Sequence, residues 1–119
     1  MDGNDEQWAA QLRKGSLELC MLALLARDER YGYQIAQGLS RAGGLVVSEG
    51  TIYPLLSRLQ REGLVAARWH ESPAGPPRKY YRLTLAGQQA LEARAQAWQE
   101  FSQAVDEIVQ EAHHARSTS

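Results

Sequence analysis

The last third of the chain carries a stripe of large apolar residues that is too long for so small a protein to bury by itself. These side chains recur with the seven-residue spacing of one helix face: Leu91, Trp98, Phe101, Val105 and Ile108. We predict a helix over residues 84–112, capped by Thr84 and about 43 Å long at 1.5 Å per residue. Because a chain of 119 residues has only a modest core, the stripe is most economically buried against a second copy of the chain.

Residues 48–63 predict a shorter helix with clear ends. Ser48 is a favourable N-cap, because its hydroxyl can accept a hydrogen bond from a first-turn amide that otherwise lacks a partner. Gly63 closes the helix, because glycine adopts the left-handed conformation without a steric clash. Four residues at helical spacing form its buried face: Ile52, Leu55, Leu56 and Leu59.

The opposite face of this short helix is small and polar at its start and basic toward its end. It presents Gly50, Tyr53, Ser57 and Arg61, with Arg58 on its flank. A firmly seated helix with such an exposed face fits the major groove of DNA. An ordinary amphipathic helix with a solvated basic face has the same pattern, so this segment alone leaves both interpretations open.

The net charge of −1 conceals an uneven distribution of charge along the chain. Residues 41–82 contain seven Arg and Lys side chains against three Glu, whereas residues 1–40 and 83–119 are both net negative. The positive charge is therefore concentrated in the short helix and in the segment that follows it. A surface that contacts DNA requires this kind of asymmetry.

The first part of the chain predicts two further helices. Residues 6–26 have helical periodicity, interrupted at Gly15 and Ser16 either by a kink or by the boundary between an arm and the first core helix. After a charged turn, a second helix is expected from Tyr31 to about residue 42. An apolar connector at residues 45–47, with the composition of a short strand, then leads into the short helix. This order fits a helix-turn-helix with a connector longer than the tight form.

Two alternating segments, residues 64–70 and 78–83, predict β-strands around a loop at residues 72–77 that is rich in proline. A hairpin of this size is too small to stand alone, and beside a helix-turn-helix it would form a wing. Arg78 and Lys79 directly follow the stiff loop, so their charges are well placed to contact phosphates. The alternative is a basic turn that is simply solvated.

Composition disfavours several other classes of protein. The longest apolar run has eight residues, well short of the roughly 18 that a membrane helix needs, and the acidic N-terminus is unlike a signal peptide. A single cysteine, Cys20, forms no internal disulfide, so we expect a buried thiol and a cytoplasmic protein. His70 stands alone on a predicted edge strand, and His113 and His114 lie in a polar tail, residues 113–119, that we expect to be disordered. We therefore expect no enzyme, no catalytic residues, no metal site and no cofactor.

The aromatic residues have two interpretations each. Tyr33 and Tyr53 stand near predicted helix starts, where a phenol hydroxyl can donate to a phosphate, although such residues also commonly serve in packing. Trp98 and Phe101 can line an apolar cavity and stack on a flat ligand. Trp8 and Leu12, on one stripe of the first helix, are their candidate partners. Ordinary packing in a dimer core would use the same side chains.

Three motifs in this order make the chain resemble one known family. They are Tyr-Gly-Tyr at residues 31–33, Glu-Gly-Thr-Ile-Tyr-Pro-Leu-Leu at 49–56, and Gly-Pro-Pro-Arg-Lys-Tyr-Tyr-Arg-Leu-Thr at 75–84. Over about residues 12–91 the chain resembles the PadR family of bacterial transcriptional regulators. Its single C-terminal helix is similar to the compact branch of that family.

The resemblance implies a winged helix-turn-helix repressor that dimerises through its first and last helices and binds palindromic operators. It also implies that the helix at residues 48–63 enters the major groove while the wing approaches neighbouring phosphates or the minor groove. Some compact members bind planar aromatic compounds between subunits through a tryptophan on the last helix, and Trp98 falls at that place. The DNA contacts expected from the resemblance and from the pattern of the short helix together are Tyr33, Ser48, Gly50, Thr51, Tyr53, Ser57, Arg58, Arg61, Arg78 and Lys79.

Together, the residue patterns and the resemblance predict a mainly α protein with a small β-hairpin. An N-terminal arm and a winged helix-turn-helix domain are expected over residues 1–83, followed by a dimerisation helix over residues 84–112. The expected partners are double-stranded DNA, a second copy of the chain and a planar aromatic small molecule, with no membrane. The alternative is a ligand-sensing or protein-binding winged-helix module without operator binding. The operator, the regulated genes, the effector and the choice between repression and activation cannot be inferred from the sequence.

Overall fold

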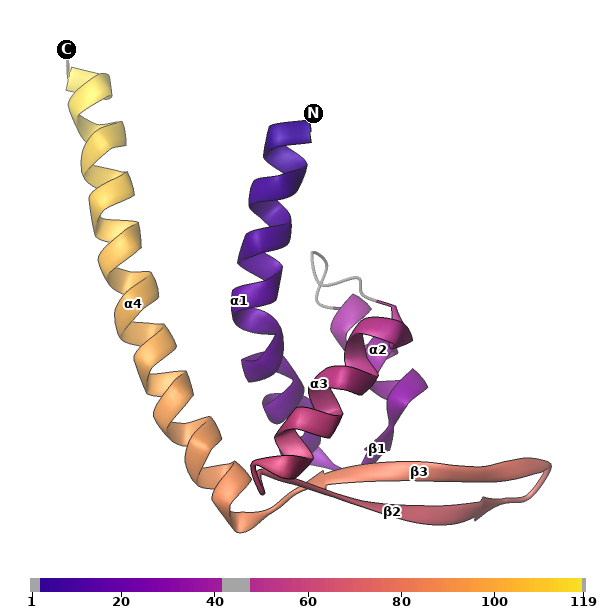
Figure 1. Ribbon diagram of the computed structural model, residues 1–119. Coiled ribbons are helices and arrows are strands. Elements are labelled where there is room, and N and C mark those ends of the chain that lie inside the picture. The colour runs from indigo at the N-terminus through magenta and orange to yellow at the C-terminus, as the bar shows by residue number, and fades with distance from the viewer. Residues whose placement is uncertain (1–2, 42–47, 119) are drawn as a thin grey trace.

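The computed structural model describes residues 3–41 and 48–118, which form a helical body with a sheet at one end and a long helix rising from it (Figure 1). The elements follow in the order α1 (Gly3–Arg27), β1 (Arg30–Tyr31), α2 (Gly32–Arg41), α3 (Glu49–Arg61), β2 (Val65–Ser72), β3 (Gly75–Leu83) and α4 (Leu85–Thr118). The molecule is elongated, at 64 × 33 × 21 Å, because α1 and α4 both extend away from the sheet (Figure 1). The predicted mainly helical, winged helix-turn-helix class is confirmed.

The wing is an antiparallel hairpin of β2 and β3. Its register runs from Val65 opposite Leu83 to Ser72 opposite Gly75, with an irregularity between His70 and Ser72. The predicted hairpin is thus confirmed, but its strands extend further into the proline-rich loop than expected. Prolines are tolerated in this part of β3 because β1 pairs only with Tyr80 and Tyr81, so one edge of the strand needs no backbone donors here.

A third strand, β1, was not predicted, because residues 27–30 were expected to form only a charged turn. Arg30 and Tyr31 instead pair with Tyr81 and Tyr80, so the sheet has the order β1-β3-β2. Two residues are too few for a strand to appear in the hydrophobic periodicity.

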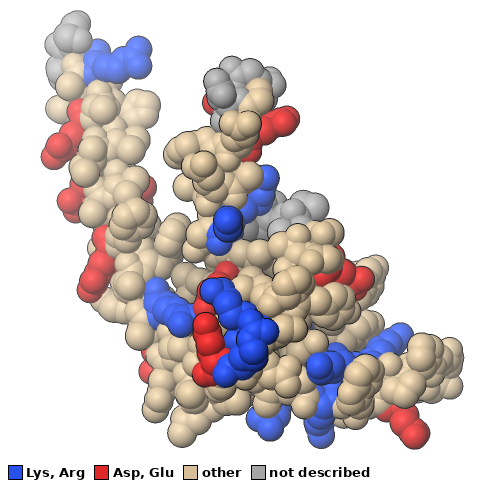
Figure 2. All heavy atoms as spheres, viewed as in Figure 1, with Lys and Arg blue, Asp and Glu red and all other residues tan. Residues whose placement is uncertain are grey.

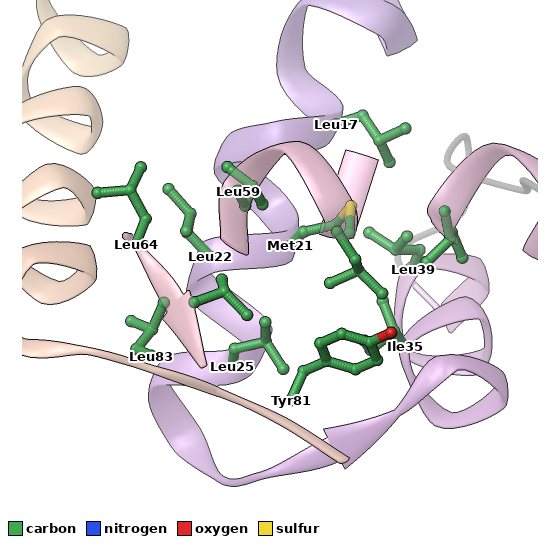
Figure 3. Packing of buried hydrophobic residues seen from close by; sticks show 13 residues of the cluster. Leu17, Met21, Leu22, Leu25, Ile35, Leu39, Leu59, Leu64, Tyr81 and Leu83 are labelled. Carbon is green, nitrogen blue, oxygen red and sulfur yellow. The ribbon is translucent and has the colours of Figure 1, made fainter. Parts of the chain in front are cut away.

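The core lies where the three N-terminal helices meet the base of the sheet (Figure 3). Its largest fully buried side chains are Met21, Leu22, Ile35, Leu39, Ile52, Leu56, Leu59 and Val65. Three of them belong to the predicted buried face of α3, whereas Leu55 is only partly buried. Since burying one such side chain stabilises a fold by about 1.5–3 kcal/mol, α3 is firmly seated.

The ends of α3 agree with the predicted positions but not fully with the predicted contacts. Ser48 is the N-cap residue, yet its hydroxyl makes no capping bond and instead lies 3.4 Å from Thr51 Oγ1. The carbonyl of Ser48 accepts from the Thr51 amide at 3.0 Å. At the other end Gly63 has the predicted left-handed conformation, with φ of 78°.

The two long helices are more continuous than predicted. α1 passes through Gly15 and Ser16 without a break and includes residues 3–5, because a single glycine costs only about 1 kcal/mol in a long helix. The predicted end of the last helix at residue 112 is also wrong, since α4 continues to Thr118. Residues 113–118 contain neither glycine nor proline to stop a helix, and they are helical rather than disordered. No helix among the described residues is both long and apolar enough to cross a membrane.

The connector predicted at residues 45–47 and the expected last residue of the second helix, residue 42, lie outside the described residues. α2 is described as far as Arg41.

The first turn of α4 is held tightly against the end of α3. Thr84 accepts from the Gly87 amide at 3.0 Å, which confirms the predicted cap, and donates to the Gly63 carbonyl at 2.7 Å. A Cβ on Gly87 would lie 2.0 Å from the backbone oxygen of Leu64. Glycine is therefore required here for α4 to leave the domain at its observed angle.

Candidate DNA-binding surface and adjoining cleft

The start of α2, the first turns of α3 and the wing meet at one surface. The ring of Tyr53, on α3, lies so close to Gly32 that a Cβ on that glycine would be 2.3 Å from the phenol oxygen. From the wing, the Arg78 guanidinium lies 4.6 Å from the ring centre of Tyr31, the residue just before α2. Three segments expected to face DNA are thus linked by side-chain contacts.

Most of the predicted DNA-contacting residues lie exposed in these three segments. The exposed ones are Tyr33, Ser48, Gly50, Thr51, Tyr53, Ser57, Arg58, Arg61 and Arg78. Lys79 is half-buried, with its Nζ 5.7 Å from the ring centre of Tyr81. Small residues at the start of α3 leave its first amides and the positive end of its dipole open to an anion. This surface has the chemistry to bind phosphate groups.

Tyr53 combines packing with an available hydroxyl. Its side chain is 44% exposed although its ring rests on α2. Partial burial, and then the nearby charge of Glu49, raise the pKa of the Tyr53 phenol. The hydroxyl therefore stays protonated at neutral pH and can donate to a phosphate oxygen.

Arg58 is directed differently from the other predicted DNA contacts. Its Nη2 lies 2.5 Å from Oε2 of Glu18 on α1, and the second oxygen of Glu18 accepts from Arg94 on α4. Charged groups of both signs accordingly gather where α4 meets the body of the protein (Figure 2). Sequence reasoning missed Glu18 and Arg94, although Glu18 is the only charge within residues 17–25. A contact between Arg58 and DNA stays a prediction.

A cleft of about 920 Å³ lies beside this ion network, between α1 and α4. Its lining includes Leu12 from α1 and Trp98 and Phe101 from α4, three of the four residues predicted to bind an effector. Trp8, the fourth, is exposed and is not part of the lining. The volume lies within the range of pockets for small molecules, and the aromatic wall offers a surface for stacking.

The predicted dimerisation stripe is largely open to solvent in the single chain. Trp98, Phe101, Val105 and Ile108 are between 42% and 69% exposed along α4. Leu91, at the start of the stripe, instead packs partly against the core of its own chain. A contiguous row of large apolar side chains at this exposure indicates a surface that another molecule covers.

A second ion cluster joins the wing to the segment before α2. The Glu29 carboxylate accepts from Nε and Nη2 of Arg68, both at 3.1 Å, and lies 2.6 Å from Nε2 of His70. His70 also meets the ring of Tyr80 edge-on, with 4.6 Å between centres. The expectation that His70 stands alone was wrong, because it depended on overlooking β1, which brings Glu29 to the wing. Hydrogen bonds from Arg68 above all, and also from His70, lower the pKa of Glu29.

Comparisons with known proteins agree with this architecture. Residues 21–93, more than half of the chain, match the transcriptional regulator PadR-like family. The chain is also 35% identical over 95 residues to a transcriptional regulator of Mycobacterium tuberculosis, covering 80% of this chain and 87% of that protein.

Solved structures show the same similarity. A PadR-like transcriptional regulator from Bacillus cereus superimposes with a TM-score of 0.77 and 42% identity, covering 84% of this chain and 97% of that one. A PadR family regulator from Eggerthella lenta gives a TM-score of 0.79 and 32% identity over 87% of this chain and 90% of that one. The chain therefore belongs to the PadR-like family of DNA-binding transcriptional regulators, which are not enzymes.

Proposed function

We propose that this PadR-like regulator is a homodimeric repressor that binds a palindromic operator and is released by a planar aromatic effector. The observation that carries the proposal is the arrangement of α4. Its apolar stripe is exposed, and two members of the stripe, Trp98 and Phe101, also line the cleft between α1 and α4, which Arg58 of α3 borders. The exposed stripe and the cleft thus share residues, and the cleft borders the helix that we assign to DNA.

The exposed stripe supports a symmetric dimer. Trp98, Phe101, Val105 and Ile108 follow the spacing of a coiled-coil seam, and a two-fold pairing covers the same stripe on both chains. Such a pairing also brings a second α4 toward the open side of the cleft. The effector site would then be shared between subunits.

For DNA, we propose that α3 enters the major groove and that the wing contacts the flanking backbone. The residues in these roles are Tyr33, Ser48, Gly50, Thr51, Tyr53, Ser57, Arg61, Arg78 and Lys79, with Arg58 as a further candidate. A dimer then places two copies of α3 in half-sites about one helical turn apart. Operator symmetry would mirror the symmetry of the protein.

For regulation, we propose that a flat apolar ligand stacks on Trp98 and Phe101 in the cleft. Such a ligand releases DNA only if it binds more tightly to a dimer whose recognition helices no longer fit the operator. Leu12 on α1 and Trp98 on α4 line opposite walls, so a bound ring would change the separation of these two helices.

The DNA-binding part is tested by fluorescence anisotropy on the upstream DNA of the protein's own gene and on a scrambled duplex, at two salt concentrations. We expect tighter binding to the upstream DNA and a steep loss of affinity with salt. Equal, weak binding to every promoter fragment tested would contradict the operator. Run-off transcription from the bound promoter distinguishes a repressor, which lowers the transcript, from an activator.

The effector part is tested by tryptophan fluorescence in a protein with Trp8→Phe and Trp69→Phe, which leaves only Trp98. An acridine dye or a flavin should quench this residue in a saturable manner and lower the affinity for the operator. Absence of quenching by any member of a panel of planar aromatics would argue against the ligand site.

A further inference from the structure

One carboxylate connects three helices beside the cleft. Glu18 of α1 receives Arg58 of α3 at one oxygen, at 2.5 Å, and Arg94 of α4 at the other. Only 23% of the Glu18 side chain is exposed, whereas the two arginines are 47% and 42% exposed. The acceptor, Glu18, is therefore largely buried, whereas its two donors, Arg58 and Arg94, are partly exposed to solvent.

This network differs from an ordinary surface ion pair. An isolated exposed pair contributes little to stability, but several charges sharing one geometry hold it better. Each guanidinium is planar and rigid, so it constrains direction as well as distance. Glu18 itself stands in an apolar stretch of α1 and borders the packed core at Leu17, Met21 and Leu22, so its backbone is a fixed point.

The network also spans the parts of the molecule that must keep their relative orientation. Ile52, Leu56 and Leu59 hold α3 in the core, and Gly87 fits the start of α4 against Leu64. These contacts fix the base of α4 but lie away from the cleft. The Glu18 network adds a link from α3 to the part of α4 beyond its first turns, at residue 94.

We propose that Glu18 is a positioning residue that sets the orientation of α3 relative to α4, and thereby the separation of the two recognition helices in the dimer. The inference rests on the proposed homodimeric, operator-binding function. Because Glu18, Arg58 and Arg94 all line the cleft, a molecule that occupies the cleft meets this link directly. The same carboxylate therefore connects cleft occupancy to the fit on DNA.

The first test measures the preference for half-site spacing. Operator duplexes are made with the half-sites at their natural spacing and moved by one base pair in either direction, about 3.4 Å per step. Glu18→Gln and Arg94→Gln each break the link, and Arg58 is left intact because it is also a candidate DNA contact. We expect both variants to reduce the discrimination between spacings by about two- to fivefold, the lower end of the coupling seen between residues of one network.

The two variants separate positioning from charge. Glu18→Gln raises the net charge by one and Arg94→Gln lowers it by one, so their electrostatic effects on absolute affinity are opposite, whereas the spacing preference should change in the same direction. Glu92→Gln, exposed on α4, is the matched control and should keep the wild-type preference. An unchanged preference in both variants, or an equal loss of affinity at every spacing, would overturn the inference.

A second test needs no DNA, so it also separates this inference from the proposed function. Spin labels at Gln60→Cys on α3 and Gln99→Cys on α4, in a Cys20→Ser background, report the distance between the helices. Dilution with unlabelled protein restricts the signal to one chain. Glu18→Gln and Arg94→Gln should broaden or shift the distribution, and Glu92→Gln should not. A response here without operator binding would refute only the proposed function, whereas identical distributions would refute the role of Glu18.

Discussion

The ring of Tyr53 packs on the backbone of Gly32, so the exposed face of α3 and the start of α2 are joined at the surface that we assign to DNA. The contact leaves no space for a Cβ, which would lie 2.3 Å from the phenol oxygen and 2.6 Å from the adjacent ring carbon. Glycine is thus favoured at position 32 by the close approach of the Tyr53 ring and not by an unusual backbone conformation. Its role is to hold Tyr53 in one orientation.

Gly32→Ala should therefore displace Tyr53 and weaken operator binding. Because the exposed phenol end of Tyr53 can move aside, we expect a loss of stability below about 1 kcal/mol, and a fall in operator affinity larger than on scrambled DNA. Thermal unfolding and anisotropy measure the two effects.

A double-mutant cycle with Tyr53→Ala checks the cause. If the clash is with Tyr53, the cost of Gly32→Ala largely disappears once the ring is removed. Gly15→Ala, whose Cβ meets nothing within 4 Å, is the control and should be neutral or stabilising. An undiminished cost in the Tyr53→Ala background would contradict the assignment.

Much of the fold was predictable, because it depends on periodicity and on local end signals. Each of three features depends on a signal within a few neighbouring residues: the buried face of α3 at Ile52, Leu56 and Leu59, the left-handed Gly63 and the Thr84 cap. The continuity of α1 was not predictable, because a break at Gly15 and Ser16 would need a tertiary partner that stabilises it. Strand β1 was missed for the opposite reason: its two residues are stabilised only by their pairing with β3.

The candidate site was predictable to a smaller extent. Aromatic residues on the last helix indicated a ligand surface, and the cleft does include Trp98 and Phe101. The ion networks of Glu18 and Glu29 were missed, because their partners are about 40 to 76 residues distant in the chain. Long-range pairing of charges leaves no periodic signal in a single sequence.

The cluster around Glu29 predicts a pH dependence of stability. Hydrogen bonds from Arg68 in particular lower the pKa of Glu29 in the folded protein. A carboxyl with a depressed folded pKa contributes stability above its unfolded pKa, and this contribution is lost as the pH falls through the folded pKa. Glu29→Gln should therefore melt at a lower temperature than wild type at pH 7, with the difference shrinking below about pH 4.

Thermal unfolding followed from pH 7 to pH 3 measures this difference. Glu71→Gln, exposed on the same wing, removes the same charge and should follow the wild-type profile. A Glu29→Gln difference that is constant with pH would show that the ionised carboxylate is not what stabilises the wing.

Removing both basic residues in the outer half of the wing, Arg78 and Lys79, should change how binding responds to salt. If Arg78 and Lys79 each neutralise one phosphate, the double Ala variant lowers the slope of log affinity against log salt by about 2. The loss should be similar on operator and scrambled DNA, because phosphates carry no sequence. Lys14→Ala, on α1, removes one charge away from the wing and should leave the slope unchanged. An unaltered slope in the double variant would place the wing away from the backbone.

The exposed stripe of α4 makes the sharpest prediction about assembly. Val105 lies between Phe101 and Ile108 in the stripe, so Val105→Glu would bring two carboxylates together in an apolar seam. An unpaired buried charge costs roughly 3–5 kcal/mol, which weakens a dimer by more than about a hundredfold. Sedimentation should then show a monomer at micromolar concentration. Operator affinity should also fall, because a monomer contacts only one half-site. Gln103→Glu, on the opposite face of the same helix, adds the same charge and should leave the dimer intact. A stable Val105→Glu dimer would show that the chains pair through another surface.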